Sequence, residues 1–324
     1  MFTMLAIALC LAVMFLVLTG ASVLSTAASR LLLRRMGSIT PGTKANLLFV
    51  LRLMPLALGC VVTFGLALPS FLEFEPSSTK EGMGFRLMAL AILGALLLLG
   101  MLARGVSILH ATSQAQRGWR ERSERMNVAT LRAPVYRVEN GASLLAVTGI
   151  LRPKIFVGSE IAEALSPDEL HAALAHEMAH VSSFDNLKQF LLKSTRAPRW
   201  LKVLHQADAE WTNTSEIAAD RAALAEGASV LDLSSALIKV GRLKRPLAGR
   251  DPVASHLVPS ACSGALESRV TRLTDMLEGR DAAPARGVKR MNLFLPMLIS
   301  LAVYLACIHA LLPAVHEVLE LLVR

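Results

Sequence analysis

A His-Glu-Met-Ala-His stretch at residues 176–180 carries the side chains of a metal-dependent hydrolase. On a helix, His176 and His180 are four positions apart, so both imidazoles lie on one face and can reach a single ion. Glu177 lies about 100° further round the helix, where it can act on water but is badly placed as a third ligand. The alternative is a surface helix with two solvated histidines.

A second spaced pair, Glu216 and Asp220, favours the metal site over that alternative. These carboxylates share one face of a helix predicted over Ser215 to Leu224, with Ser215 as its N-cap. Since catalytic zinc keeps three protein ligands and one open position, we expect Glu216 to be the third ligand. We expect Asp220 to accept a hydrogen bond from the outer N–H of His176. A solvated acidic stripe, the alternative, fits the apolar neighbours less well.

The helix that carries the two histidines has a marked start. Ser166 is a suitable N-cap, Pro167 suits the first helical position, and Glu169 completes a capping box. The pattern predicts one helix from Ser166 to Leu192. Three short strands are predicted before it, which indicates an α+β lobe: Val135 to Val138, Leu144 to Thr148, and Lys154 to Val157.

One of these strands could hold a peptide. If Leu144 to Thr148 lies at the edge of the sheet, an extended peptide can add to it through main-chain hydrogen bonds. A strand buried inside the sheet is the alternative.

Three segments together resemble a known family. A His-Glu-x-Ala-His-x-x-x-x-Asp motif runs from His176 to Asp185, after Gly149-Ile-Leu-Arg-Pro-Lys-Ile and before Glu216-x-x-x-Asp220. They resemble the BlaR/MecR-type membrane zinc metallopeptidases and, more distantly, the HtpX and CAAX prenyl protease group. The resemblance covers about residues 135–277 and implies a gluzincin fold with a zinc ion in each chain. Asp185 is expected to cap or brace the helix.

Four uncharged segments are long enough to span a bilayer, the third only just. A mean hydropathy of +0.50 and 53% apolar residues agree with a membrane protein. The predicted spans are Met1 to Ser29, Leu53 to Leu72, Leu87 to Ala103 and Met291 to His316. The first could instead be a cleaved signal peptide, although no Lys or Arg precedes its apolar run.

Basic residues predict the orientation of the chain. The loop after the second span is net acidic, whereas Lys and Arg gather after the first span and on both sides of the catalytic segment. We therefore expect a multi-pass protein of the bacterial inner membrane, with both termini outside and the peptidase in the cytoplasm. The expected divisions are a membrane domain at residues 1–110, a zinc metallopeptidase domain at 111–282, and a linker, fourth span and outside tail at 283–324.

This layout of three spans before the peptidase and one after it resembles BlaR/MecR more than HtpX, which has two and two. BlaR/MecR sensors carry an extracellular penicillin-binding domain after their last span. Here only about a dozen residues follow Leu312, so we expect no sensor domain. The resemblance therefore supports the protease and leaves β-lactam sensing without support.

A net charge of +9 does not require a nucleic-acid partner, because the basic clusters lie at predicted membrane edges. The stretch His110 to Val128 is predicted as a helix near the bilayer surface. The four cysteines show no metal-ligand spacing.

Two residues are candidates for the donor that an oxyanion requires. Ser255-His256, followed by Glu267-Ser268-Arg269-Val270, resembles the His-Pro and Glu-Arg-Ile segments of the HtpX and CAAX group. Leu257 replaces the proline, and the spacing is longer. His256 and Arg269 are the candidates, and a loop histidine and a helix-face arginine are the alternatives. Further candidates are His205 and Arg221.

The expected fold is an α+β membrane protein with four transmembrane helices and a mainly helical gluzincin-type domain that carries a small β-sheet. We hypothesise an integral-membrane zinc endopeptidase that acts at the cytoplasmic membrane face and, by resemblance, cleaves a regulatory or repressor protein in signalling. An HtpX-like quality-control protease and a catalytically silent transducer stay open. The expected partners are a protein or peptide substrate and the lipid bilayer, and a homo-oligomer stays open.

Overall fold

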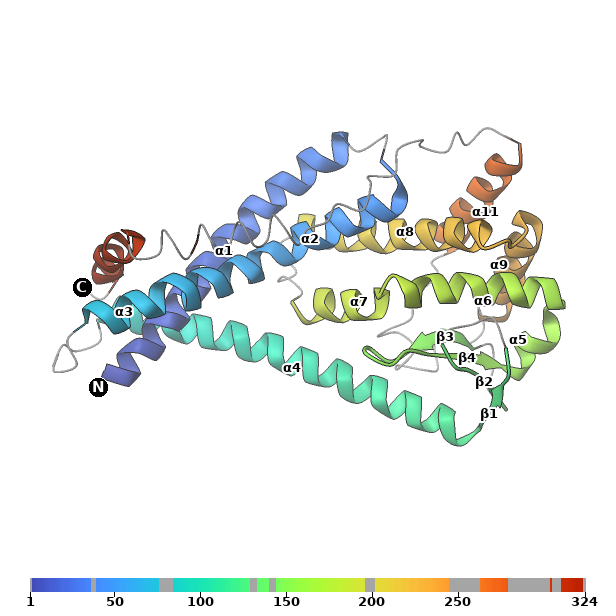
Figure 1. Cartoon of the computed structure of the whole chain (residues 1–324), viewed down its shortest axis with the longest axis horizontal. Helices are drawn as coiled ribbons and strands as arrows, with labels where there is room; N and C mark the ends of the chain where they lie inside the picture. Colours follow the sequence, from blue (N-terminus) through green and yellow to red (C-terminus); the bar gives the residue numbers. More distant parts are fainter. Residues whose placement is uncertain are drawn as a thin grey trace. The chain divides into compact units, whose positions relative to one another are not determined.

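The computed structural model of the chain describes residues 2–35, 39–75, 84–128, 133–139, 144–195, 202–244, 263–278, 304 and 310–322. Over these residues the protein is mainly helical with one four-stranded sheet (Figure 1). The chain divides into two compact units. The first holds Met1–Gly37, Val50–Ala103 and Val288–Arg324, and the second holds Ser38–Phe49 and Arg104–Gly287.

Long apolar helices supply most of the first unit. They are α1 (Phe2–Arg35), α2 (Pro41–Cys60), the π-helix η1 (Val61–Ala67), α3 (Leu68–Phe74) and α4 (Phe85–Glu121). The start of α2 up to Phe49 and the end of α4 from Arg104 belong to the second unit. Among the described residues, three stretches are long and apolar enough to cross a membrane: Phe2–Ser29, Pro41–Phe74 and Phe85–Glu121. The first three predicted spans are therefore confirmed as apolar helices. The predicted fourth span lies largely outside the described residues, of which 310–322 are helical.

The second of these stretches depends on hydroxyl donors from other segments. Pro55 has no N–H, so the carbonyl of Leu51 lacks its helical donor, and the Ser25 hydroxyl donates to that carbonyl at 2.7 Å. Further along, the Tyr304 hydroxyl donates to the carbonyl of Gly65 in the π-helix at 2.5 Å. Within a bilayer these backbone groups must find partners inside the protein. Side chains therefore complete the hydrogen bonding of this span.

The sheet of the second unit has the strand order β1-β2-β4-β3. Its strands are β1 (Ser123–Met126), β2 (Val135–Val138), β3 (Leu145–Thr148) and β4 (Lys154–Gly158). Strands β2 and β4 are parallel, and the other two pairs are antiparallel. The three predicted strands are confirmed, and β3 lies at an edge. The helix predicted over His110 to Val128 is wrong beyond Glu121, because β1 pairs with β2 there.

Both faces of this sheet are covered. On one face, Leu145, Val147 and Ile155 pack in a core with α5 (Ser159–Ala164), α6 (Pro167–Ser182) and α9 (Val230–Lys244). On the other face, Phe156 lies 5.6 Å from Trp119 of α4, measured between ring centroids. Helix α6 therefore packs against a sheet whose core residues are buried on both faces.

Helix α6 begins as predicted but ends early. The capping box of Ser166 and Glu169 is present, whereas the single helix predicted over Ser166 to Leu192 is wrong. A turn at Ser183 and Phe184 separates α6 from α7 (Asp185–Ser194), and Phe184 has a positive φ of 56°. Left-handed backbone at a phenylalanine is uncommon and has no Gly or Pro to signal it in the sequence.

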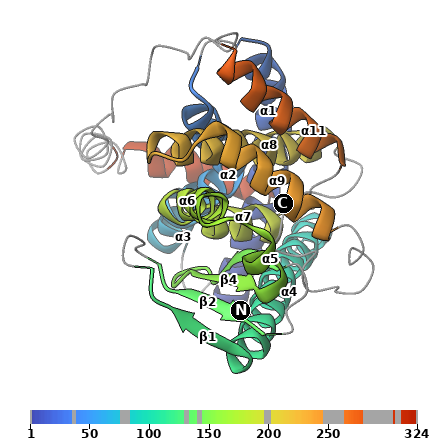
Figure 2. The same cartoon turned by 90° about the vertical axis from the view of Figure 1, so that its right-hand side faces the viewer.

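Helix α8 (Lys202–Ala225) lies on the side of α6 opposite the sheet, as both views show (Figure 1, Figure 2). The prediction that Ser215 caps the start of this helix is wrong. Ser215 is buried in the helix interior, where its hydroxyl donates to the carbonyl of Thr212 at 2.8 Å. A serine can bond back to its own helix in this way and so does not mark a boundary. Helix α11 (Ser263–Leu277) completes the described part of this unit.

Glu169 joins the start of α6 to α9. Its Oε2 accepts from the Ser166 backbone N–H and from Lys239 Nζ, both at 2.7 Å, and its Oε1 accepts from Ser235 Oγ at 2.5 Å. The hydrogen bonds of Lys239 and Ser235, opposed by burial, lower the pKa of Glu169 from 4.5 to about 2.

We predict that Glu169→Gln destabilises the protein at neutral pH. Glutamine can keep the capping bond but loses the charge that binds Lys239. We expect a cost of about 1 kcal/mol, because Lys239 is partly exposed, and therefore a fall in Tm of roughly 2–4 °C. Because the pKa is depressed on folding, this stabilisation is present above pH 4.5 and is lost as the pH falls towards 2.

Thermal unfolding of the full chain in detergent, followed by circular dichroism, measures this difference. The control is Glu226→Gln, which changes an exposed carboxylate in the turn after α8. An equal Tm for wild type and Glu169→Gln at pH 7 would contradict the prediction, as would a difference that stays constant down to pH 2.

Candidate metal centre

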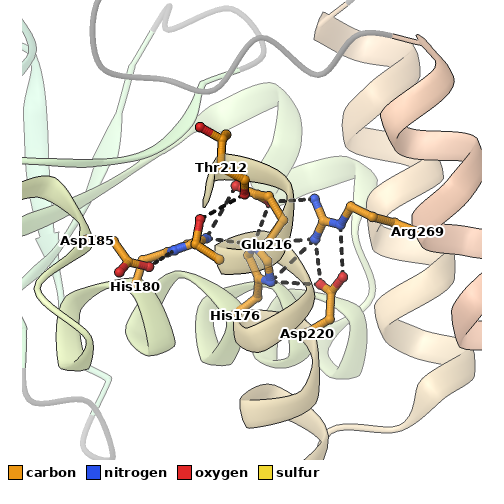
Figure 3. Close-up of polar contacts among 8 residues, drawn as sticks. His176, His180, Asp185, Thr212, Glu216, Asp220 and Arg269 are labelled. Atoms are coloured by element: carbon orange, nitrogen blue, oxygen red, sulfur yellow. Dashed lines mark hydrogen bonds and ion pairs between the residues drawn. The ribbon is translucent and has the colours of Figure 1, made fainter. Parts of the chain in front are cut away.

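Helix α6 brings two imidazoles together, with their ring planes nearly perpendicular. One turn separates His176 from His180, and their Nε2 atoms lie 3.2 Å apart (Figure 3). The side chains are 8% and 14% exposed, respectively. Because the capping box and the sheet fix the start and the underside of α6, these positions follow from the fold.

Helix α8 brings a carboxylate to the same point. Glu216 Oε2 lies 3.6 Å from His176 Nε2, and Oε1 lies 3.6 Å from His180 Nε2. Small residues allow this approach, since Ala172 and Ala175 of α6 pack in one core with Ala223 of α8. Larger side chains at such a contact would hold two helices further apart.

The three side chains fit one metal ion. Two ligand atoms that each lie 2.0–2.1 Å from a tetrahedral ion are about 3.4 Å from each other. The observed separations of 3.2, 3.6 and 3.6 Å lie close to that value. Among the described residues, His176, His180 and Glu216 form a group whose ligand atoms all lie within 4.8 Å of one another. This group could hold a metal.

A carboxylate lies behind each imidazole. Asp220 Oδ1 is 2.9 Å from His176 Nδ1, and Asp185 Oδ2 is 2.7 Å from His180 Nδ1. An N–H that donates from Nδ1 leaves the lone pair of Nε2 directed at the centre, which is how metal-binding histidines are usually held. The geometry at Asp220 agrees with its expected role. At Asp185 the expectation was a brace for the helix, and the structure adds a contact with the histidine.

The charges of the site balance one another. Burial disfavours protonated His176, but hydrogen bonds with Asp220 and Glu216 outweigh it and raise the pKa of His176 to about 9. Burial likewise opposes the charge of His180, yet the hydrogen bond with Asp185 raises its pKa. In Glu216, burial is outweighed by His176, and the pKa is lowered. With a pKa of about 9, His176 is protonated at neutral pH when no metal is bound, so metal binding must release that proton.

Arg269 of α11 reaches the centre from a third helix. Its Nε and Nη2 donate to the two oxygens of Asp220 at 2.9 and 2.5 Å, and its Nη1 donates to Glu216 Oε2 at 2.8 Å. Figure 3 shows the guanidinium between these carboxylates. Burial opposes its charge, but pairing with Asp220 raises the pKa of Arg269. This oxyanion candidate therefore lies in the site.

Glu177 is half-buried beside the histidines. Within the part of the chain that the structure describes, its carboxylate makes no hydrogen bond or ion pair. It is close enough to Arg269 for their charges to attract. The carboxylate is therefore available for proton transfer.

Three candidates from the sequence remain: His256, His205 and Arg221. His256 is outside the described residues, and so is the side chain of His205. Arg221 is half-buried on α8 but forms none of the contacts described at the centre. Sequence reasoning missed the contact between Asp185 and His180, because it depends on the turn at Ser183 and Phe184.

Comparison with known proteins identifies the chain. The BlaR1 peptidase M56 family matches residues 74–272, more than half of the 324 residues and the whole of the centre described above. No curated protein and no solved structure matches. The apolar helices and the family together indicate a membrane peptidase, with protein as its substrate and the lipid bilayer around it. The chain belongs to the BlaR1 peptidase M56 family.

Proposed function

We propose that this protein is an integral-membrane zinc endopeptidase of the gluzincin type, with its active site at the cytoplasmic face. One observation carries the proposal: two imidazoles and a carboxylate converge at metal-binding distance, and each imidazole has an acidic partner at its outer nitrogen. Two histidines and a glutamate are the ligands of catalytic zinc in several peptidases.

The ligands in this proposal are His176, His180 and Glu216. When bound, zinc supplies a Lewis acid that polarises a peptide carbonyl and makes water more acidic. Asp220 and Asp185 keep Nδ1 of each histidine protonated and so keep each Nε2 available. Apolar packing around α6 and α8 lowers the local dielectric constant, which strengthens the electrostatic interactions between these charges.

Glu177 is the proposed general base. It takes a proton from the attacking water and returns it to the leaving amine. Its carboxylate is suited to this because no described neighbour forms a hydrogen bond or ion pair with it.

Arg269 is the proposed positive charge for the oxyanion, with His256 as a second candidate. Three N–H groups of Arg269 are donated to Asp220 and Glu216, and a guanidinium has five. Nη2 also lies 3.4 Å from the ring nitrogens of His176. The second N–H of Nη1 is therefore the one left to donate to a developing oxyanion, and the bonds already formed fix the plane of the group.

The edge strand β3 supports binding of an extended peptide, since an edge offers main-chain groups to an added strand. The basic residues that flank the spans support a cytoplasmic location. We infer that the substrate is a cytoplasmic or membrane-bound regulatory protein. Comparison of the proteomes of cells with wild type and with Glu177→Gln tests this: one accumulating regulator supports signalling, whereas many accumulating damaged membrane proteins would indicate quality control.

We predict that Glu177→Gln removes peptidase activity while the protein keeps its metal. Loss of the base should lower kcat by about 10²–10⁴-fold, and no ligand is changed. Cleavage of casein by the purified full chain in detergent, together with metal analysis, measures both. Glu160→Gln, an exposed change on α5, is the control. Equal cleavage by wild type and Glu177→Gln would refute the enzymatic proposal.

We predict that Asp220→Asn weakens zinc binding by about 10–100-fold, because the partner of a ligating histidine is altered. Glu216→Ala, which removes a ligand, should reduce zinc further. Competition with a chromophoric chelator gives the affinities, and Asp232→Asn on α9 is the control. Unchanged affinity in both Asp220→Asn and Glu216→Ala would place the metal elsewhere.

A further inference from the structure

The outer edge of β3 can be identified from its pairing with β4. The carbonyl of Leu144 accepts from the Gly158 N–H at 2.6 Å, and Thr148 lies opposite Lys154. Backbone groups alternate in direction along an antiparallel strand. Residues 144, 146 and 148 therefore face β4, and the carbonyls of Val147 and Gly149 point away from it.

A single side chain meets both of those outward carbonyls. Asn186 Nδ2 donates to Val147 O at 3.3 Å and to Gly149 O at 3.0 Å. Only the NH2 end of the amide can face two acceptors. Gly149 helps this convergence, because its φ of +96° bends the strand end, and an added Cβ would lie 2.6 Å from the carbonyl oxygen of Arg152.

The next residue along the chain reaches the metal centre. Asp185 precedes Asn186 in the first turn of α7, and its Oδ2 lies 2.7 Å from His180 Nδ1. Adjacent residues therefore link the edge strand to a candidate metal ligand: one contacts Val147, and the other contacts His180. A helix turn holds the two side chains at a fixed spacing.

We propose that Asn186 is a positioning residue that sets the register of a peptide substrate on β3. The inference rests on the proposed peptidase function. A peptide that adds to β3 forms hydrogen bonds with the outward-pointing backbone groups of this strand, and these bonds set its register. Asn186 holds one of those groups, the carbonyl of Val147, at a fixed position relative to His180. Because Asn186 binds the carbonyl of Val147 and Asp185 binds His180, the two side chains set the distance from the edge strand to the metal ligand. That distance determines which peptide bond of the substrate reaches the metal. A carbonyl has two lone pairs, so Val147 can accept from Asn186 and from a substrate N–H together.

The test separates binding from hydrolysis. In the full chain in detergent, with Glu177→Gln present, anisotropy measures the affinity for fluorescein-labelled β-casein. Asn186→Ala and the isosteric Asn186→Asp, neither of which can donate, should each weaken binding by about tenfold. Zinc content should stay unchanged. The control is Ser183→Ala, an exposed change in the same turn.

A second readout follows the register itself. With Glu177 intact, mass spectrometry of casein fragments should show cleavage sites shifted in Asn186→Ala, and KM should rise more than kcat falls. Binding that is unchanged or tighter in Asn186→Ala overturns the inference, as does loss of zinc or a fall in Tm that accompanies weaker binding. Binding is read without turnover, so absent hydrolysis in wild type refutes the proposed function alone.

Discussion

The structure depends on keeping several charges together inside an apolar interior. His176, Glu216, Asp220 and Arg269 are all buried or nearly so, and each would be costly alone. They come from three different helices, so the helices must pack correctly before any of the charges is satisfied. The charged residues are therefore satisfied only in the correctly packed fold. The alanines between α6 and α8 contribute to this packing, because their small side chains let the two helices approach.

Much of the centre could be predicted, because helical spacing makes local geometry readable. Residues four apart share a face, which is enough to foresee the arrangement of His176 with His180 and of Glu216 with Asp220. The capping box at Ser166 was also readable, since its chemistry is local. The positions of the first three apolar helices followed from length and hydropathy alone.

What could not be predicted depends on contacts that are distant in sequence. The break at Phe184 has no local signal, and without it Asp185 would continue the helix of His180 and not face its ring. Strand β1 exists because β2 offers it an edge, and short polar strands carry little signal of their own. Ser215 resembled a cap because its neighbours were apolar, although α8 had begun well before it.

The second apolar stretch is jointed, not a uniform rod. Its ladder of backbone hydrogen bonds is interrupted at Pro55 and again widened over Val61–Ala67. Helices bend most readily at a proline and at a π-bulge, and at each of these two places a hydroxyl from another segment donates to a backbone carbonyl. The two places divide the span into three shorter helical pieces.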